Sequence, residues 1–175
     1  MNAVELKNLD RLQKSMTSLL KGFGISSVEL GNEYAYYYIS ESVTFKLTYT
    51  LVDSWFDEFI SKRFNIAIGD LCDSFVLSLL HEVGHHMTGD NIPDDIQTDI
   101  DKKKDKYQKW IDKKFMPKFL CKKIEFEYFT LFDELMATRW AVWYYRNHPK
   151  EVKEMKLKAQ SALHRFYADN NVTND

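Results

Sequence analysis

The feature that most constrains the fold is a helical pattern over residues 70–87, in which apolar side chains cover about half of the circumference. A face this wide must be buried against other elements, so the chain needs a packed core. His81 and His85 stand one turn apart outside the apolar face, and the small side chains of Ser74 and Ser78 share their sector. This arrangement predicts that the histidine pair lines the floor of a cleft.

Length and composition place the chain among folded proteins. Its 175 residues, 45% of them hydrophobic and 15% aromatic, suffice for a single domain over residues 1–175 without stabilising crosslinks. Cys72 and Cys121 fit no disulfide framework and are predicted to be reduced thiols. The net charge of −2 gives no argument for nucleic acid or a membrane as partner. The N-terminal segment has acidic residues within its apolar pattern, which excludes a signal peptide and indicates the cytoplasm.

Periodicity along the rest of the chain predicts a mostly helical α+β domain. In residues 43–51 apolar side chains alternate with Thr and Lys, which predicts a strand, and the aromatic segment 34–39 is its expected hairpin partner. A small antiparallel sheet or hairpin thus precedes the histidine helix, for which Asp70 suits the N-cap and Gly89 the stop. The other predicted helices cover residues 4–21, 53–65, 90–120 with a break at Pro117, 123–147 and 150–168. The ten lysines between 102 and 123 are interpreted as a solvated helix face.

The segment HEVGH, residues 81–85, has the spacing of a metal-binding helix. Neutral imidazoles of His81 and His85 can hold one metal ion, and Glu82 points beside them, within reach of a metal-bound water. Gly84 costs the helix about 1 kcal/mol relative to Ala, which indicates close approach of another backbone or a substrate. His86 points to the apolar side and is predicted to be a hydrogen-bonded buried residue instead of a ligand.

A catalytic zinc site needs a third protein ligand and an open fourth position. Glu134 is the best candidate, because small side chains within about 60° of its direction would let the metal-bearing helix come close. These small residues are Ala137, Thr138 and Ala141. The large Trp140 and Trp143 are expected in the core.

Two roles stay open at this point. The alternative carboxylate ligands are Glu127, Asp133, Glu125 and Asp90. A donor to the oxyanion of the reaction is also expected. Its candidates are His148, Arg139, Tyr144 and the tyrosines of residues 34–38, whereas Tyr145 is too far along a straight helix from Glu134.

Together, HEVGHHMTGD (81–90) and ELMATRWA (134–141) resemble small gluzincin-type zinc metallopeptidases, which include ImmA/IrrE-like and phage-type minigluzincins. In these, a glutamate opens the pattern E-x-x-A-x-x-aromatic-A, matched here by Glu134, Ala137, Trp140 and Ala141. The resemblance covers about a tenth of the chain. It implies one Zn²⁺ bound by His81, His85 and Glu134 with Glu82 as general base, and a zincin-like fold whose edge strand pairs with an extended peptide.

The resulting hypothesis is a zinc-dependent peptidase that acts on a peptide or protein substrate. Its rival is a catalytically silent, zinc-containing regulatory or protein-binding domain, although an intact Glu82 has no use in a structural zinc site. A zinc-free helical domain is a third possibility. The charged segment 90–117 is either a scaffold helix or a lid between the two ligand-bearing helices. The sequence does not specify the oligomeric state.

Overall fold

The computed structural model describes residues 3–31, 35–37, 40–45, 55–89, 92–111 and 117–169. The helices are α1 (Ala3–Leu20), η1 (Lys21–Phe23, a 3-10 turn), α2 (Trp55–Phe64), α3 (Leu71–Gly89), α4 (Asp94–Ile111), α5 (Lys118–Tyr128), α6 (Phe132–Asn147) and α7 (Pro149–Asp169). The strands are β1 (Ser27–Leu30), β2 (Ala35–Tyr37) and β3 (Ser42–Phe45). The fold is therefore α+β, mostly helical with a small sheet, as predicted.

The sheet is mixed, which corrects the prediction of a purely antiparallel sheet or hairpin. β2 and β3 form the expected antiparallel hairpin, with Tyr36 opposite Val43. β1 was not predicted, and it lies parallel to β3 on the other side, with Val28 also opposite Val43. Val28 and Val43 are both buried, so the strands are held together by apolar contact at their centres. The part of the predicted strand beyond residue 45 lies outside the described residues.

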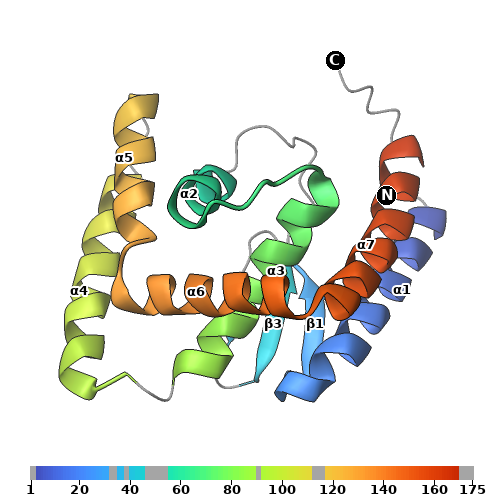
Figure 1. The fold of residues 1–175 in the computed structure, drawn as a ribbon, viewed down its shortest axis with the longest axis horizontal. Helices are drawn as coiled ribbons and strands as arrows, with labels where there is room; N and C mark the ends of the chain where they lie inside the picture. The colour runs from blue at the N-terminus through green and yellow to red at the C-terminus, as the bar shows by residue number, and fades with distance from the viewer. Residues whose placement is uncertain are drawn as a thin grey trace.

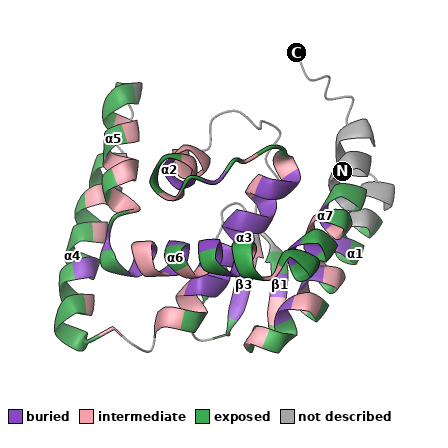
Figure 2. Cartoon of the chain, in the orientation of Figure 1, coloured by how far each residue is buried: buried purple, intermediate pink, exposed green. Residues whose placement is uncertain are grey.

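α3 lies at the centre of the molecule, and α6 crosses it (Figure 1). The Asp70 side chain accepts a hydrogen bond from the Asp73 backbone N–H at 2.9 Å, which confirms the predicted N-cap. The central stretch of α3 is buried almost throughout, including residues on its histidine face (Figure 2). The helix continues to Gly89 and ends there, two residues beyond the predicted end at residue 87.

The helix boundaries in the charged region (90–120) and in the aromatic region (123–147) differ from the prediction. α4 ends at Ile111 and α5 starts after Pro117, where one helix over 90–120 was predicted. α5 and α6 are separate helices, where one helix over 123–147 was predicted. A turn interrupts them, because the Thr130 hydroxyl and backbone N–H both donate to the Glu127 carbonyl. This break places Asp133 and Glu134 in the first turn of α6.

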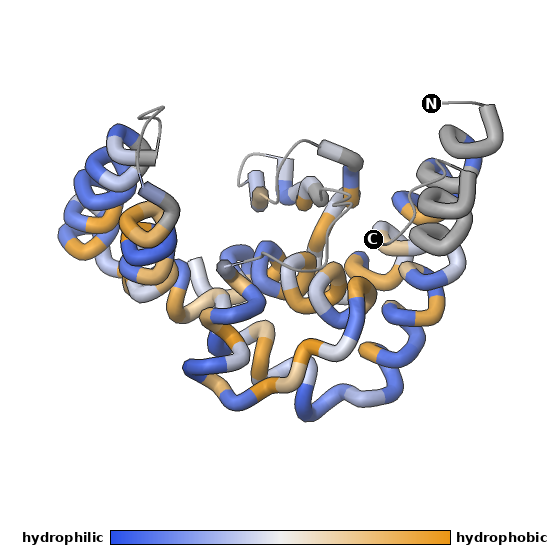
Figure 3. Tube along the Cα trace, turned by 90° about the horizontal axis from the view of Figure 1, so that it is seen from above, coloured by the Kyte–Doolittle hydropathy of each residue, from blue (hydrophilic) through white to orange (hydrophobic). Residues whose placement is uncertain are grey.

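Two helix pairs flank the central helices on opposite sides, α1 with α7 and α4 with α5 (Figure 3). The main core lies between α1, α3, α7 and the sheet, where Met16, Leu79 and Met155 are buried. The prediction for Trp143 is wrong, because its side chain is 52% exposed. Trp140 is half-buried and stacks on Tyr144. Within the described residues, no helix is both long and apolar enough to cross a membrane.

Candidate metal centre

The structure brings His81, His85 and Glu134 together. Their potential ligand atoms all lie within 4.8 Å of one another. Glu134 Oε2 is 3.1 Å from His81 Nε2 and 3.5 Å from His85 Nε2. Two ligands held about 2.0–2.1 Å from one tetrahedral Zn²⁺ lie roughly 3.3 Å apart, so these two separations fit a shared ion. The side chains of His81, His85 and Glu134 are 7%, 11% and 4% exposed.

The close approach predicted at Gly84 is confirmed, and it explains how two helices share three ligands. A Cβ atom on Gly84 would lie 2.4 Å from the Ala137 carbonyl oxygen and 2.8 Å from the Ala137 Cα. The α3 and α6 backbones therefore touch at this point. Gly84 stands between the two histidines along α3, and Ala137 stands one turn after Glu134 along α6. The contact sets the depth at which the carboxylate meets the imidazoles.

Thr138 fixes the orientation and tautomer of the His81 ring. Its hydroxyl donates its single hydrogen to the Glu134 carbonyl at 2.7 Å. The same oxygen lies 3.0 Å from His81 Nδ1, so it must accept a hydrogen bond from the protonated Nδ1. His81 Nε2 of the neutral ring then carries a lone pair toward Glu134 Oε2, which is also an electron-pair donor. Two such atoms repel unless a proton or a metal ion lies between them, and a bound metal ion would take the place of the proton in the hydrogen bond.

The charges around this group also favour a divalent cation. Glu82, Asp133 and Glu134 are carboxylates with residual exposures of 7%, 4% and 3%. One ammonium group faces two of them, because Lys104 of α4 forms ion pairs with Asp133 and, at 2.6 Å, with Glu134 Oε1. With neutral imidazoles and ionised carboxylates, three negative charges and one positive charge leave a net charge of −2.

The pKa shifts separate the two glutamates. Burial raises the pKa of Glu82 and outweighs the attraction of His81 and His85. Burial acts in the same direction on Glu134, but hydrogen bonds with both histidines outweigh it and hold the Glu134 pKa well below the usual range. For His85, burial acts to lower the pKa, yet the Glu134 carboxylate raises it overall. Glu134 is thus suited to bind a cation at neutral pH, and Glu82 to accept a proton.

Three neighbours of the site were missed by sequence reasoning. Lys104 stands in a lysine-rich helix, where no pattern distinguishes it from the others. Tyr128 of α5 shares a hydrogen bond with the Glu134 carboxyl, and the Lys104 ammonium lies 5.5 Å from the centre of its ring. Phe56 of α2 packs edge-on against the His81 ring, with 4.9 Å between centroids. Buried carboxylates need partners, but the sequence does not indicate which lysine or tyrosine supplies them.

The rival ligands do not join the group. Among the described residues, His81, His85 and Glu134 form the only cluster of three that can hold an ion. Asp133 faces Lys104, and Glu127 accepts a 3.5 Å hydrogen bond from Tyr107. Burial raises the pKa of Glu125 to about 7, but no metal-binding cluster of described residues includes it. Asp90 lies outside the described residues.

Several of the candidate oxyanion donors have partners elsewhere in the described part of the chain. Tyr145, which was predicted to be too far from Glu134 for this role, donates a hydrogen bond to Asp73 near the start of α3. Tyr144 and His148 stack on each other with centroids 4.1 Å apart, and Arg139 is exposed. His86 is partly buried, and its Nδ1 lies 2.6 Å from the Tyr36 hydroxyl, so it links α3 to β2 and is no ligand. Tyr34 and Tyr38 lie outside the described residues.

Comparisons with protein-family models, curated proteins and solved structures each gave no match to this chain. The resemblance of the two motifs to gluzincin-type peptidases therefore stays a prediction. The function is therefore inferred from the geometry of the described residues. That geometry shows two imidazoles and one carboxylate placed so that they can hold one metal ion.

Proposed function

We propose that this protein is a zinc-dependent metallopeptidase of zincin-like type, with His81, His85 and Glu134 as metal ligands and Glu82 as general base. Two nitrogen ligands and one carboxylate are a common ligand set of catalytic zinc, and they leave a fourth position for a reactant. The observation that carries the proposal is the convergence of Glu134 Oε2 on both imidazoles, 53 and 49 positions away along the chain.

A bound Zn²⁺ supplies Lewis acidity, which polarises a scissile carbonyl and makes a water molecule more acidic. Glu82 accepts the proton of the attacking water and transfers it to the leaving amine nitrogen. The raised pKa of Glu82 favours the first transfer, because a more basic carboxylate accepts a proton more readily. The amine nitrogen is more basic still and takes the proton from Glu82 as the C–N bond breaks. Glu134 stays ionised throughout, and Thr138 holds the His81 ring in place.

Replacement of Glu82 by glutamine separates catalysis from metal binding. We expect Glu82→Gln to retain about one zinc per chain and to lose on the order of 10²–10⁴-fold in kcat, because only the general base is removed. Zinc is measured by elemental analysis, and activity on unfolded casein and a mixed peptide library. Glu125→Gln is the control, since it makes the same change at a partly buried glutamate outside the cluster and should leave both measurements unchanged.

Two results would contradict the proposal. A wild-type protein that holds no zinc after reconstitution removes the metal site. A zinc-loaded wild type that cleaves neither casein nor any library peptide, with Glu82→Gln behaving identically, favours the catalytically silent regulatory domain instead.

A further inference from the structure

The charged helix α4 contacts a proposed metal ligand through Lys104. Among the described hydrogen bonds and ion pairs, no other side chain of α4 does so. The Lys104 Nζ lies 2.6 Å from Glu134 Oε1 and also pairs with Asp133, and the lysine side chain is 29% exposed. The neighbouring lysine differs in kind. Lys103 pairs with Asp99 one turn away on the same helix, and both side chains are more than half exposed.

The two oxygens of Glu134 have separate partners. Oε2 faces His81 and His85, whereas Oε1 faces the Lys104 ammonium. A carboxylate whose second oxygen is held by a charged hydrogen bond offers one oxygen to a metal ion. Without that ammonium, the Tyr128 hydroxyl is the described neutral donor that remains on the Glu134 carboxyl. A carboxylate held by the weaker neutral bond can turn and offer both oxygens, which would fill the position that a reactant needs.

Asp133 keeps the ammonium where it is. One of its oxygens pairs with Lys104, and the other, Oδ1, is buried without a hydrogen-bond partner in the described part of the chain. The aspartate therefore depends on Lys104 for its charge compensation, so the ammonium is bound from two adjacent residues of α6. An ion pair that only attached α4 to the molecule would not require a contact with the ligand itself.

We propose that Lys104 is a positioning residue of the metal centre, which restricts Glu134 to single-oxygen ligation and keeps the fourth position open. The inference rests on the proposed metal site. It assigns a role to α4 as part of the centre instead of a scaffold beside it.

The test compares Lys104→Met, Lys104→Arg and the matched control Lys103→Met. Each is loaded with Co²⁺, whose visible absorption is stronger in a four-coordinate than in a five-coordinate site, and the zinc dissociation constant is measured by competition with a chromophoric chelator. Thermal unfolding checks that each variant folds. Lys104→Gln keeps a hydrogen-bond donor without the charge and replaces the methionine variant if that one does not fold.

We expect Lys104→Met to weaken the cobalt absorption toward five-coordinate intensity and to lower the zinc dissociation constant about tenfold. A freed carboxylate oxygen adds a ligand, and a positive charge near the ion is lost. The kcat should fall at least tenfold with little change in KM, because the reactant position is filled. Lys104→Arg and Lys103→Met should resemble wild type in the cobalt spectrum.

A cobalt spectrum that is unchanged in Lys104→Met, whether zinc affinity is unaltered or weaker, overturns the inference and leaves Lys104 as a structural ion pair. The proposed function stands in that case, because wild type still binds metal and Glu82→Gln still reports on catalysis. A wild type that binds neither cobalt nor zinc overturns the metal site and this inference together.

Discussion

At the scale of single residues, the chemistry of the site depends on how each donor atom is held. Thr138 is fully buried, and its hydroxyl connects the Glu134 carbonyl to His81 Nδ1. The Thr138 side chain therefore hydrogen-bonds the backbone carbonyl of the proposed ligand Glu134 on α6, and it sets the tautomer of the proposed ligand His81 on α3. Partners of this kind typically change metal affinity by 10–100-fold when they are removed.

Thr138→Val should therefore weaken zinc binding about tenfold, because valine has the same shape but cannot accept the Nδ1 hydrogen. The zinc dissociation constant, measured by chelator competition, checks this. Thr138→Ser should restore most of the affinity.

Thr98→Val is the control for that experiment. The Thr98 hydroxyl also donates to the carbonyl four residues earlier, at 2.9 Å, but on the exposed face of α4. If Thr138→Val binds zinc as tightly as Thr98→Val does, the tautomer assignment for His81 is wrong.

Sequence spacing was enough to predict that His81, His85 and Glu134 converge, because helix geometry places residues four apart on one face and small residues permit close packing. It could not predict Lys104 or Tyr128. Their contacts with Glu134 depend on how α4 and α5 pack against the first turn of α6. A local sequence pattern carries no information on such long-range packing.

At the scale of elements, the crossing of α3 and α6 is the contact on which the site depends. Gly84→Ala should destabilise the protein by about 3 kcal/mol, because the added Cβ would meet the Ala137 backbone at 2.4 Å and cannot be relieved by a rotamer change. Urea unfolding measures the loss. Zinc affinity should fall as well, because the helices must separate.

Gly22→Ala is the comparison for that variant. A Cβ atom on Gly22 has nothing within 4 Å, so this substitution should change the stability by less than about 1 kcal/mol. Equal stabilities of the two alanine variants would show that the backbones do not touch as described.

Several element boundaries were beyond sequence reasoning. The break between α5 and α6 depends on Thr130, whose hydroxyl competes for a backbone carbonyl, although threonine also occurs within helices. β1 has only four residues, too few for a period-two pattern to be distinct from a loop. The longer and strongly periodic α1, α3 and α7 were predicted within two residues at each end.

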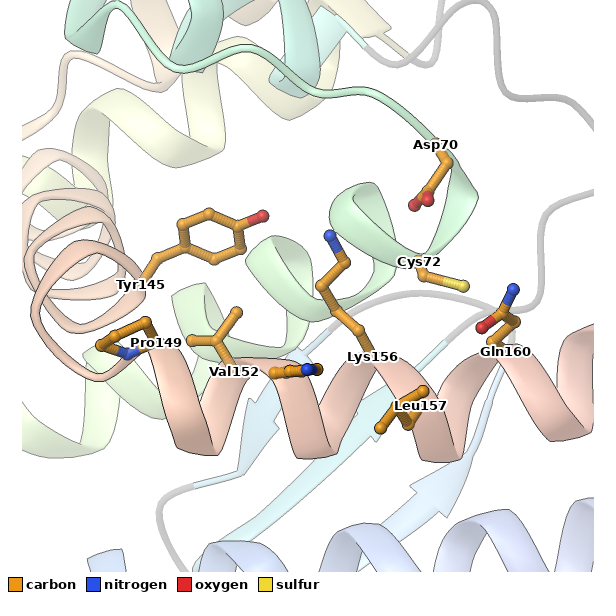
Figure 4. A pocket seen from close by; sticks show the side chains of 9 residues that line it. Asp70, Cys72, Tyr145, Pro149, Val152, Lys156, Leu157 and Gln160 are labelled. Atoms are coloured by element: carbon orange, nitrogen blue, oxygen red, sulfur yellow. The ribbon is translucent and has the colours of Figure 1, made fainter.

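At the scale of the whole molecule, a buried carboxylate away from the metal centre joins three helices. Asp73, near the start of α3, is 7% exposed and accepts hydrogen bonds from Tyr145 of α6 and the Gly69 backbone, and it pairs with Lys156 of α7. Tyr145 and Lys156 line a cavity of about 300 Å³ together with Asp70 and Cys72. The Tyr145 hydroxyl and the Lys156 ammonium point toward the start of α3 (Figure 4). Burial raises the pKa of the Cys72 thiol to about 11, so it is protonated and unreactive at neutral pH.

This cluster makes stability depend on pH. Burial acts to raise the pKa of Asp73, but the bonds from Lys156, Tyr145 and Gly69 outweigh it, so the folded-state pKa lies below the ordinary 3.8. The stability contributed by ionised Asp73 is therefore complete above that value and is lost as pH falls through the lower folded pKa.

We expect Asp73→Asn to cost about 2 kcal/mol at neutral pH, since charged hydrogen bonds are lost. The difference between wild type and variant should shrink as the pH falls below about 4, as urea unfolding at several pH values would measure. Asp10→Asn removes an exposed pair with Lys14 and should change little. A wild-type advantage that is the same at low and neutral pH would contradict the role of Asp73.

The contact between Gly84 and Ala137 lies much closer to Glu134 than to the far end of α6. Glu134 is three residues from Ala137, a lever arm of about 4.5 Å, so a swivel of α6 by 10° would displace its backbone by less than about 1 Å. The far end of α6, ten residues from Ala137, would travel about 15 Å × 0.17, or roughly 2.6 Å, in the same motion. A small rotation of α6 about this contact would therefore change the spacing of the donor atoms much less than it would move the end of the helix.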